Sequence, residues 1–500
     1  MTYASLAKRF FLAGALLAAT VVASSAQTFK TIVKFAGPTS AFPRLVSLVQ
    51  GTDGNLYGTT SGAALPTAAG LPPKGTVFKM TPAGAITTIY NFTAPSGTYL
   101  NGAIPFAGLL LGTDGFFYGT TDEGGTSTAC TKGCGTVFKI SASGVLTTLH
   151  SFNSSDGANP IAALVQGTDG NLYGTTDAGG AFTCAAYGGL GCGTIFKITP
   201  NGQFTTLHSF SGADGFEPGA ALIQGTDGSL YGTTFEGGSN NGGTVFRITT
   251  PGLLSTLHNF CSQSGCADGS LPMAALFQAD NGEFYGTTQA GGDTQCAAGG
   301  GGTVFKITST GTLTTLHAFC GDDGELPIAP LVRGTDGDLY STTSVGGGNP
   351  NCPNFNGCGT VFKLAPSGAL TSLHIFDSID GNTIYGGLVQ ATNGTFYGTT
   401  YAGGVSRAGG NGTVYSLSVG LGPFIQTLPT SSKSGSTVKI LGTNLTGATA
   451  VTFNGLSATF TVNSRSLITA IVPAGATTGP VVVTTPTATL TSNQNFHVTK

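Results

Sequence analysis

Tryptophan is absent from this chain of 500 residues, and charged side chains are scarce. Lys, Arg, Asp and Glu together make up 8% of the residues, against roughly 25% in a typical soluble protein. The formal net charge is only −3, so no strongly basic surface is available to neutralise phosphates, and nucleic acid is not expected as a partner. Glycine is the opposite extreme, with 81 copies, which is typical of a protein built from short strands and many turns.

Long apolar runs are also missing, with one exception near the N-terminus. Phe10–Val22 is a run of apolar and small residues that follows Lys8 and Arg9. It is too short for a membrane-spanning helix, which needs about 20 apolar residues, but a basic start followed by a short apolar run is typical of an export signal. We therefore predict that residues 1–26 are a cleaved signal peptide. The mature protein is then extracellular, at the cell surface or in the periplasm, and has no transmembrane segment.

Cysteine is present in ten copies, and its spacing favours disulfides. An exported protein meets oxidising conditions, and the cysteines and histidines do not form the four-ligand pattern of a zinc site. Close pairs within single loops are predicted to be Cys130–Cys134, Cys184–Cys192, Cys261–Cys266 and Cys352–Cys358. The two that are left over, Cys296 and Cys320, fall in two loops of one repeat, so a Cys296–Cys320 bridge is expected.

The chain is organised by a ten-residue segment, Gly167–Thr176, that recurs seven times. The tyrosines of the seven copies are separated by 54 to 61 residues and are Tyr57, Tyr118, Tyr173, Tyr231, Tyr285, Tyr340 and Tyr397. A period of this size indicates a repeat architecture.

Each repeat divides into four strand-like segments rich in Thr, Val, Ile, Phe and Tyr. In the third repeat these are Ile161–Gln166, Leu172–Thr176, Gly193–Thr199 and Gln203–Phe210. Asp-Gly and Pro-x-Gly sequences join them as tight turns. Four antiparallel strands per repeat predict an all-β, seven-bladed β-propeller over residues 27–419. A β-helix is the structural alternative, but its coils are much shorter than these repeats.

The ends of the repeat region predict how the propeller closes. The last repeat lacks a fourth strand, while Thr28–Phe35 resembles the fourth strands of other repeats. We therefore expect residues 28–35 to complete the final blade from outside. The first strand of each blade then lines the centre, the short turns share one face, and the longer, variable loops share the other.

The repeat pattern Gly-Thr-Asp-Gly-Asn-Leu-Tyr-Gly-Thr-Thr, then Gly-Gly, then Gly-Thr-Val-Phe-Lys-Ile, resembles the GloVer tandem repeat. Proteins with this repeat are exported bacterial proteins described by a choice of C-terminal anchors. The resemblance covers roughly residues 28–419 and implies a secreted or cell-surface role, without an established activity.

Residues 420–500 break the period and form a second predicted domain. Their short β-rich runs are Gly442–Leu445, Ala450–Phe453, Ile471–Pro473 and Thr478–Val483. These runs resemble an IPT/TIG domain, which implies an immunoglobulin-like β-sandwich, and about eighty residues with several short strands agree with that fold.

Two series of residues recur at the same place in most repeats and are candidates for a catalytic or metal-binding site. Histidines in the fourth strands are His150, His208, His258, His317 and His374. Aspartates before a glycine in the loops between blades are Asp156, Asp214, Asp268, Asp323 and Asp380. A residue present in most blades serves the blade, so we interpret the histidines as structural. The aspartates are either turn formers or weak Ca²⁺ ligands, and the turn is favoured; no other cofactor is expected.

The function predicted from this pattern is noncatalytic binding or adhesion by a monomer whose variable face contacts a glycan or a protein. Candidate binding residues in the variable loops are Phe182, Tyr187, Phe235, Glu236, Phe355 and Tyr401, because exposed aromatic rings offer stacking surfaces. Two alternatives stay open. One is a polysaccharide lyase or glycoside hydrolase that uses nonrepeated acids among Glu123, Glu217, Glu236, Glu283 and Glu325. The other is a structural spacer.

Overall fold

The computed structural model describes residues 27–36, 41–62, 74–94, 97–184, 191–293, 299–352, 357–404 and 410–499. The predicted signal peptide lies outside this range, as do Tyr187, Cys296 and Phe355. The described chain is all-β, as predicted, apart from two single-turn 3-10 helices, η2 (Ser264–Cys266) and η3 (Gly321–Asp323).

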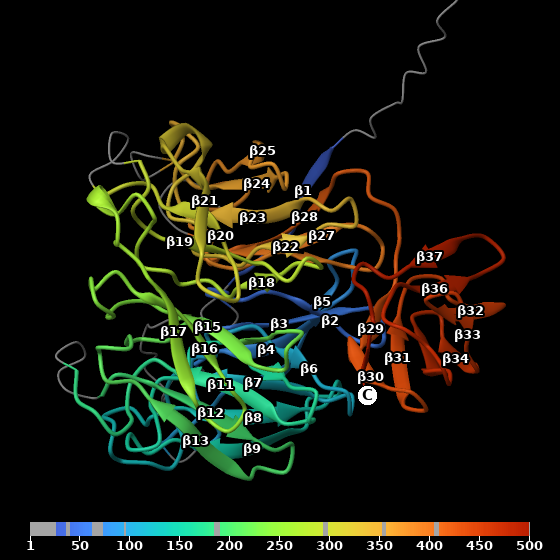
Figure 1. The fold of residues 1–500 in the computed structure, drawn as a ribbon, viewed down its shortest axis with the longest axis horizontal. Helices are drawn as coiled ribbons and strands as arrows, with labels where there is room; N and C mark the ends of the chain where they lie inside the picture. The colour runs from blue at the N-terminus through green and yellow to red at the C-terminus, as the bar shows by residue number, and fades with distance from the viewer. Residues whose placement is uncertain are drawn as a thin grey trace, which may run out of the picture.

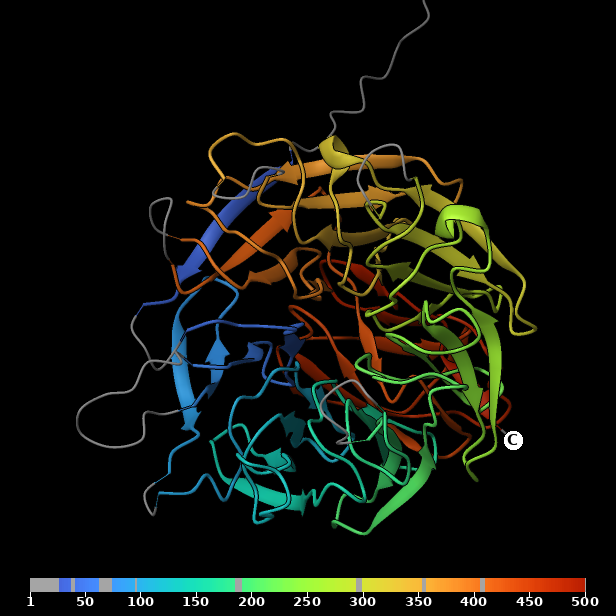
Figure 2. The ribbon, with the colours of Figure 1, turned by 90° about the vertical axis from the view of Figure 1, so that its left-hand side faces the viewer.

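Residues 28–418 form seven four-stranded antiparallel sheets, called sheets 1 to 7 in chain order and together the ring. Figure 2 shows them arranged around a common centre. Sheet 1 has β2 (Val49–Gln50), β3 (Leu56–Thr60), β4 (Thr76–Met80) and β5 (Ile86–Asn91); sheet 2 has β6 (Leu110–Leu111), β7 (Phe117–Thr121), β8 (Thr136–Ile140) and β9 (Leu146–Ser151); sheet 3 has β10 (Val165–Gln166), β11 (Leu172–Thr176), β12 (Thr194–Ile198) and β13 (Phe204–Ser209). Sheet 4 has β14 (Ile223–Gln224), β15 (Leu230–Thr234), β16 (Thr244–Ile248) and β17 (Leu254–Asn259); sheet 5 has β18 (Phe277–Gln278), β19 (Phe284–Thr288), β20 (Thr303–Ile307) and β21 (Leu313–Ala318); sheet 6 has β22 (Val332–Arg333), β23 (Leu339–Thr343), β24 (Thr360–Leu364) and β25 (Leu370–Ile375).

Sheet 7 joins the two ends of the ring. It consists of β26 (Val389–Gln390), β27 (Phe396–Thr400), β28 (Thr413–Ser418) and, outermost, β1 (Thr28–Lys34). The strand β1 pairs antiparallel with β28, from Thr28 opposite Ser418 to Lys34 opposite Thr413. The first strand of the described chain therefore completes the last sheet.

The turn between the first two strands of each repeat is Asp-Gly in five repeats and Asn-Gly in the fifth and seventh, and its own side chains hold it. In sheet 3 the hydroxyl of Tyr173 donates to Asp169 at 2.7 Å, and the backbone N–H of Asn171 donates to the same carboxylate at 3.1 Å. Gly170 takes a φ of 79°, which a residue without Cβ adopts at no steric cost. The predicted turn chemistry and the buried strand Leu172–Thr176 are both observed.

Two threonines of the Gly-Thr-Thr motif have different partners. The first bonds to the neighbouring sheet, as Thr120 Oγ1 donates to the carbonyl of Ala162 at 3.0 Å. The second joins two strands of its own sheet, as Thr121 Oγ1 lies 2.9 Å from Thr136 Oγ1. The first strand of sheet 3 is shorter than the predicted Ile161–Gln166, because the carbonyl of Ala162 accepts this bond and only Val165–Gln166 pair as strand β10.

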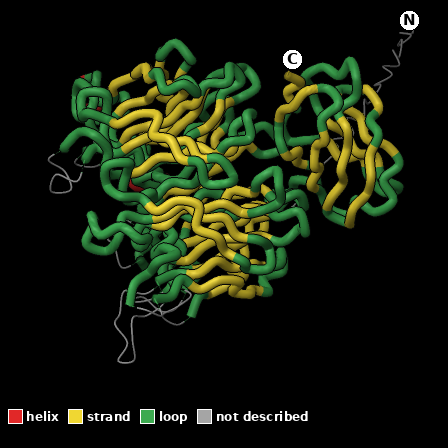
Figure 3. The backbone as a smooth tube through the Cα atoms, turned by 90° about the horizontal axis from the view of Figure 1, so that it is seen from below, coloured by secondary structure: helices red, strands yellow, loops and turns green. Residues whose placement is uncertain are grey.

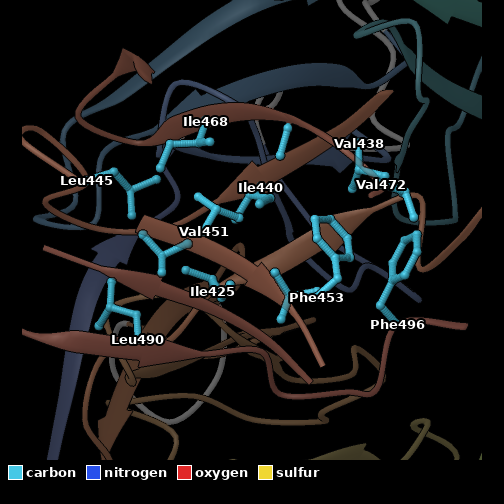
Figure 4. Packing of buried hydrophobic residues seen from close by; sticks show 13 residues of the cluster. Ile425, Val438, Ile440, Leu445, Val451, Phe453, Ile468, Val472, Leu490 and Phe496 are labelled. Carbon is cyan, nitrogen blue, oxygen red and sulfur yellow. The ribbon is translucent and has the colours of Figure 1, made fainter. Parts of the chain in front are cut away.

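The C-terminal unit, residues 425–499, has a core of its own, in which Phe453, Val451 and Ile440 are buried (Figure 4). Its strands are β29 (Gln426–Leu428), β30 (Ser431–Lys433), β31 (Thr437–Leu441), β32 (Ala450–Phe453), β33 (Leu456–Ser457), β34 (Phe460–Ser464), β35 (Leu467–Ile471), β36 (Val481–Thr484), β37 (Thr489–Thr491) and β38 (His497–Thr499). They form two four-stranded sheets, in the orders β29-β31-β35-β34 and β33-β32-β36-β37, and the pair β30-β38.

This unit docks on the side of the ring that carries the Asp-Gly turns, which we call the short-turn side (Figures 1 and 3). Ser466 Oγ donates to the carbonyl of Thr52 at 2.8 Å, and Lys439 Nζ donates to the carbonyl of Thr113 at 2.7 Å. Leu441 is buried in the core between sheets 1 and 2. The opposite side, with the longer loops, is not covered by the C-terminal unit, and Figure 2 looks onto it. We call it the open side.

Candidate binding site

A cavity of about 620 Å³ lies at the centre of the open side. Its lining comes from loops beside six of the seven sheets and includes Arg44, Phe106, Asp122, Asn159 and Tyr385. A smaller space of about 200 Å³ shares several lining residues with it and is lined in part by alanine and glycine of the innermost segments, among them Ala162, Ala163, Gly108, Ala220 and Ala274. The prediction that the first segments of the repeats line the centre is thus confirmed.

The rim of the cavity is built from one backbone device used seven times. Ahead of each sheet, one residue that is not glycine takes a left-handed conformation, with φ between 54° and 62°. These residues are Phe42, Ile104, Asn159, Glu217, Leu271, Leu326 and Thr383. Six of them precede a proline, and Thr383 precedes Ile384. Left-handed backbone costs of order 1–3 kcal/mol at such residues and is typical of functional sites.

Hydrogen bonds to both neighbouring sheets hold this conformation. Asn159 donates its N–H to the carbonyl of Cys134, just before the third strand of sheet 2, at 3.0 Å. Its own carbonyl accepts from the N–H of Asp177, just after the second strand of sheet 3, at 3.1 Å. The same two bonds recur at all seven places. The rim is therefore fixed by backbone contacts that do not depend on the side chains.

The side chains at the rim differ from repeat to repeat, in contrast to the constant strands. Two residues after each left-handed position stand Arg44, Phe106, Ile161, Gly219, Met273, Ile328 and Tyr385. The residues that directly follow the Thr-Thr pair of each repeat are Ser61, Asp122, Asp177, Phe235, Gln289, Ser344 and Tyr401. The backbone bonds of the rim do not depend on these side chains. The side chains of different repeats therefore combine in the cavity to a set that no single repeat has.

Arg44 is held among aromatic rings. Its guanidinium carbon lies 4.4 Å from the ring centre of Phe106 and 5.4 Å from that of Tyr401. Tyr401 also contacts the ring of Tyr385 at 5.4 Å. Such cation–π contacts orient a guanidinium without using its N–H donors.

Two acidic side chains on the open side have raised pKa values. Asp122 lines the cavity, whereas Glu217, at the left-handed rim position of the fourth repeat, is not among the lining residues. Burial raises the pKa of Asp122 to about 6, although Asn159 Nδ2 donates to its carboxylate at 2.9 Å and stabilises the charged form. Burial also raises the pKa of Glu217 to about 7, with the negative charges of Asp177 and Glu236 adding to the rise. Carboxyl groups with such values exchange protons near neutral pH.

Among the other nonrepeated acids, Glu123 and Glu283 are ion-paired, and Glu325 is 7% exposed and forms a backbone bridge with Val345. Glu123 lies 2.7 Å from Lys74 Nζ and 2.9 Å from Lys132 Nζ. Glu283 pairs with Lys306 at 3.0 Å beside an Asp-Gly-type turn, on the short-turn side.

The aromatic residues predicted for the variable face do not form one surface. Phe182 is 50% exposed and lines a shallow pocket of about 320 Å³ beside Ser154, away from the centre. Phe235 and Tyr401 are half-buried at equivalent rim positions of sheets 4 and 7. Glu236 follows Phe235 and forms a backbone bridge with Phe216. Tyr401 is the one of them that contacts a cavity residue, Arg44.

The two repeated series of histidines and aspartates meet in pairs. His Nε2 and Asp Oδ2 lie 2.7 to 3.0 Å apart in His150–Asp156, His208–Asp214, His258–Asp268, His317–Asp323 and His374–Asp380. Each carboxylate also accepts a backbone N–H, such as that of Asn153 to Asp156 at 2.9 Å. Over the described residues, no group of three or more His, Cys, Asp or Glu side chains gathers as a metal site would need.

Disulfides tie the loops of the open side. The predicted close pairs Cys130–Cys134, Cys184–Cys192, Cys261–Cys266 and Cys352–Cys358 are all bonded. Cys320 is also disulfide-bonded, and the predicted partner Cys296 lies outside the described residues. As for membranes, the described part of the chain holds no helix with the length and apolarity to cross one.

Sequence reasoning missed most of the cavity residues, including Arg44, Phe106, Asp122, Asn159 and Tyr385. A signal for them was present in the repeats. Six X-Pro-X sequences recur ahead of the first strands, and their flanking residues vary where the rest of the repeat is constant. Aligning the seven repeats and reading their variable columns would have found the rim.

The fold that these features define is a propeller-like, all-β repeat fold. The chain belongs to the Gloeobacter/Verrucomicrobia repeat family, whose sequence profile matches residues 18–190, 182–415 and 298–463. No relative is found among curated proteins.

Solved structures with a similar arrangement include enzymes of different activities. A fungal alcohol oxidase of the AA5 family, in complex with copper, is 14% identical with a TM-score of 0.53, over 94% of this chain and 100% of that one. Virginiamycin B lyase from Staphylococcus aureus is 15% identical with a TM-score of 0.48, over 79% of this chain and 99% of that one. A putative 6-phosphogluconolactonase from Bacteroides uniformis is 14% identical with a TM-score of 0.43, over 69% and 88%. At such identities the likeness concerns the fold alone.

Proposed function

We propose that this protein is a secreted, noncatalytic binding protein that holds a glycan in the cavity of the open side. In this proposal sheets 1 to 7 are the blades of a seven-bladed β-propeller, and the C-terminal unit is an IPT/TIG-like sandwich that leaves the open side accessible. Residues 1–26 direct export, which agrees with four disulfides in the described chain. A protein partner on the same side is the alternative occupant.

The observation that carries the proposal is the difference between constant strands and variable rim. All seven repeats share the same inter-sheet bonds, yet the cavity combines Arg44, Asp122, Asn159 and Tyr385, four different residue types from four different repeats. Its volume of about 620 Å³ is within the usual range of small-molecule sites, about 300–1,000 Å³. Polar groups beside aromatic and aliphatic walls suit the hydroxyls and C–H faces of a sugar.

A thermal-shift screen of the mature chain against soluble glycans tests the proposal. A ligand that binds the folded state alone raises the melting temperature by mass action, about 2.7 kcal/mol of stabilisation at a hundredfold excess over Kd. We expect the shift to disappear in Tyr385→Ala and to remain in Phe182→Ala, which changes an aromatic residue outside the cavity. A shift lost in Phe182→Ala but kept in Tyr385→Ala would place the binding surface elsewhere. No shift with any glycan would favour a protein partner or a spacer.

Calcium is tested in the same screen. A shift with CaCl₂ that is lost on chelation and in Asp156→Asn would give the inter-blade aspartates a metal-binding role. Without such a shift, the role of these aspartates is structural, through their contacts with the histidines.

A second candidate function is favoured by one observation, the raised pKa of Glu217 next to Asp177 and Glu236. A carboxyl group that is protonated near neutral pH can act as a general acid towards a glycosidic oxygen. The protein would then be a polysaccharide lyase or hydrolase. Release of reducing ends from a bound polysaccharide, abolished in Glu217→Gln with binding retained, would establish this activity, and its absence with bound glycan favours the noncatalytic role.

A further inference from the structure

Resting on the proposed glycan-binding function, we infer that the cavity takes a sugar residue that bears a carboxylate, a uronate at the end of an acidic glycan, and that Arg44 binds this carboxylate. The inference concerns the class of sugar. It rests on the state of Arg44, on the polar groups that line the same cavity, and on the apolar part of that lining.

Arg44 is a cation without a hydrogen-bonded or ion-paired anion among the described residues, although its charge reaches Asp122 and favours the ionised form of that carboxyl group. Among the cavity-lining residues that the structure describes, it is the one with a positive charge. Its guanidinium has ring contacts with Phe106 and Tyr401, but the described residues give it neither a hydrogen bond nor an ion pair. The planar guanidinium fork matches a carboxylate with two parallel N–H···O bonds. Because the rings already fix its orientation, little side-chain freedom is lost when it binds.

The nearby carboxyl groups leave this charge available. Asp122 shares the cavity with Arg44 but forms no ion pair with it; its carboxylate accepts from Asn159 Nδ2 at 2.9 Å instead. Asp177 is also on the lining and is 7% exposed. Carboxyl groups and amides such as these accept from and donate to sugar hydroxyls. An acidic sugar thus finds one anion-binding group and several hydroxyl-binding groups in the same cavity.

Shape and apolar walls complete the match. The lining also includes the apolar side chains of Met273, Leu326 and Ile328, which offer a surface for the C–H face of a sugar ring. The adjoining space of about 200 Å³ has no charged side chain in its lining. The group that would recognise a carboxylate is thus in the wider, outer cavity, where the end of a glycan can reach it.

The test compares sugars that differ in one group. Galacturonate and galactose, and likewise glucuronate and glucose, share all ring hydroxyl configurations and differ at C6, where a carboxylate replaces a hydroxymethyl group. Isothermal titration of the mature chain with the monosaccharides and with short oligouronates measures the difference. We expect uronates to bind at least tenfold more tightly than their neutral counterparts.

Three variants assign that preference. Arg44→Gln keeps a planar polar group and removes the charge, so it should abolish the uronate preference and leave the affinity for neutral sugars within about twofold. Arg44→Lys keeps the charge without the fork and should retain part of the preference. Phe182→Ala is the control and should behave as wild type, and melting curves establish that each variant is folded.

The outcomes separate this inference from the function on which it rests. Equal binding of uronates and neutral sugars, or an equal loss of both in Arg44→Gln, would overturn the role of Arg44 while glycan binding stands. Binding of acetate that matches uronate binding would likewise overturn it, because the sugar ring would then contribute nothing. Absence of binding by every sugar would overturn the inference and the proposed function together.

Discussion

Removal of the N-terminal strand β1 should destabilise the whole ring, because this strand joins the last sheet to the first. Phe29 stacks on the ring of His374 at 3.5 Å and lies 5.3 Å from that of Tyr415, both in the last two sheets. Phe35, directly after the strand, is 7% exposed and packs in the core between sheets 7 and 1, against Leu48. The perturbation is a mature chain that begins after residue 36.

The contribution of Phe35 sets the lower bound of the expected decrease in melting temperature. Deleting a buried phenylalanine side chain costs about 3–5 kcal/mol. A ring of about 390 residues that unfolds as one unit has an unfolding entropy near 0.8 kcal/mol/K, so Phe35→Ala should lower the melting temperature by about 4–6 °C. Truncation also removes Phe29 and the ladder to β28, and the decrease should therefore exceed 6 °C. Phe210→Ala, at the equivalent place in sheet 3, should give the single-residue decrease.

Calorimetry with a strand supplied in trans gives the decisive measurement. A synthetic peptide of residues 27–36 should restore the melting temperature of the truncated chain in a concentration-dependent way, since a partner that binds only the folded ring stabilises it by mass action. A peptide of scrambled order is the control. A truncated chain that melts within about 1 °C of the intact one would refute the argument that β1 holds the ring closed, as would rescue by the scrambled peptide.

Three further predictions concern the seam, the cavity and the docked unit. Thr399 Oγ1 donates to the buried carbonyl of Val46 at 2.9 Å across the seam, so Thr399→Val should cost about 1–3 kcal/mol in urea unfolding, whereas Thr147→Val on an exposed face should change stability by less than about 0.5 kcal/mol. Burial raises the pKa of Asp122 to about 6, so the folded state keeps a proton that the unfolded state releases from about pH 4 upward, and stability falls as the pH rises through that window. Asp122→Asn should remove up to about 3 kcal/mol of this decrease between pH 4 and pH 7; an identical pH profile for variant and wild type would contradict it. Leu441→Ala should weaken docking of the C-terminal unit by about 2–5 kcal/mol and separate its calorimetric transition from that of the ring, and a single unchanged transition would argue against this interface.

Much of the ring could be predicted from the sequence because the repeats report their own constraints. Seven copies of one pattern make a turn such as Asp169-Gly170, or a buried strand such as Leu172–Thr176, visible without any other information. The lengths of the inner strands were overestimated, because apolar character in Ile161–Leu164 reflects the lining of the centre rather than pairing. Whether such a segment pairs as a strand depends on its partners. The carbonyl of Ala162 accepts from Thr120 of the neighbouring sheet, and the sequence of a single repeat does not contain that partner.

The binding cavity was harder to predict for the same reason. Residues such as Arg44 and Asp122 come from different repeats and meet only when the ring is closed. The search for exposed aromatic residues in long loops led instead to Phe182, which lies away from the centre. The pairing of His150 with Asp156 was also missed, although both were recognised as repeated. Each series was interpreted alone. The histidine lies in a strand and the aspartate in the following loop, and their spacing in the sequence does not show that the two side chains meet.

The seven left-handed residues explain how a regular ring can carry an irregular site. Their conformation is unfavourable for residues with a Cβ, yet it recurs with Phe42, Glu217 and Thr383 alike, so it cannot depend on the side chain. Backbone bonds to the sheets on either side compensate for it. Because those bonds use only N–H and C=O groups, the residues that flank them can change without opening the ring. The repeats thus differ most at the rim of the cavity, while the threonines between sheets remain constant.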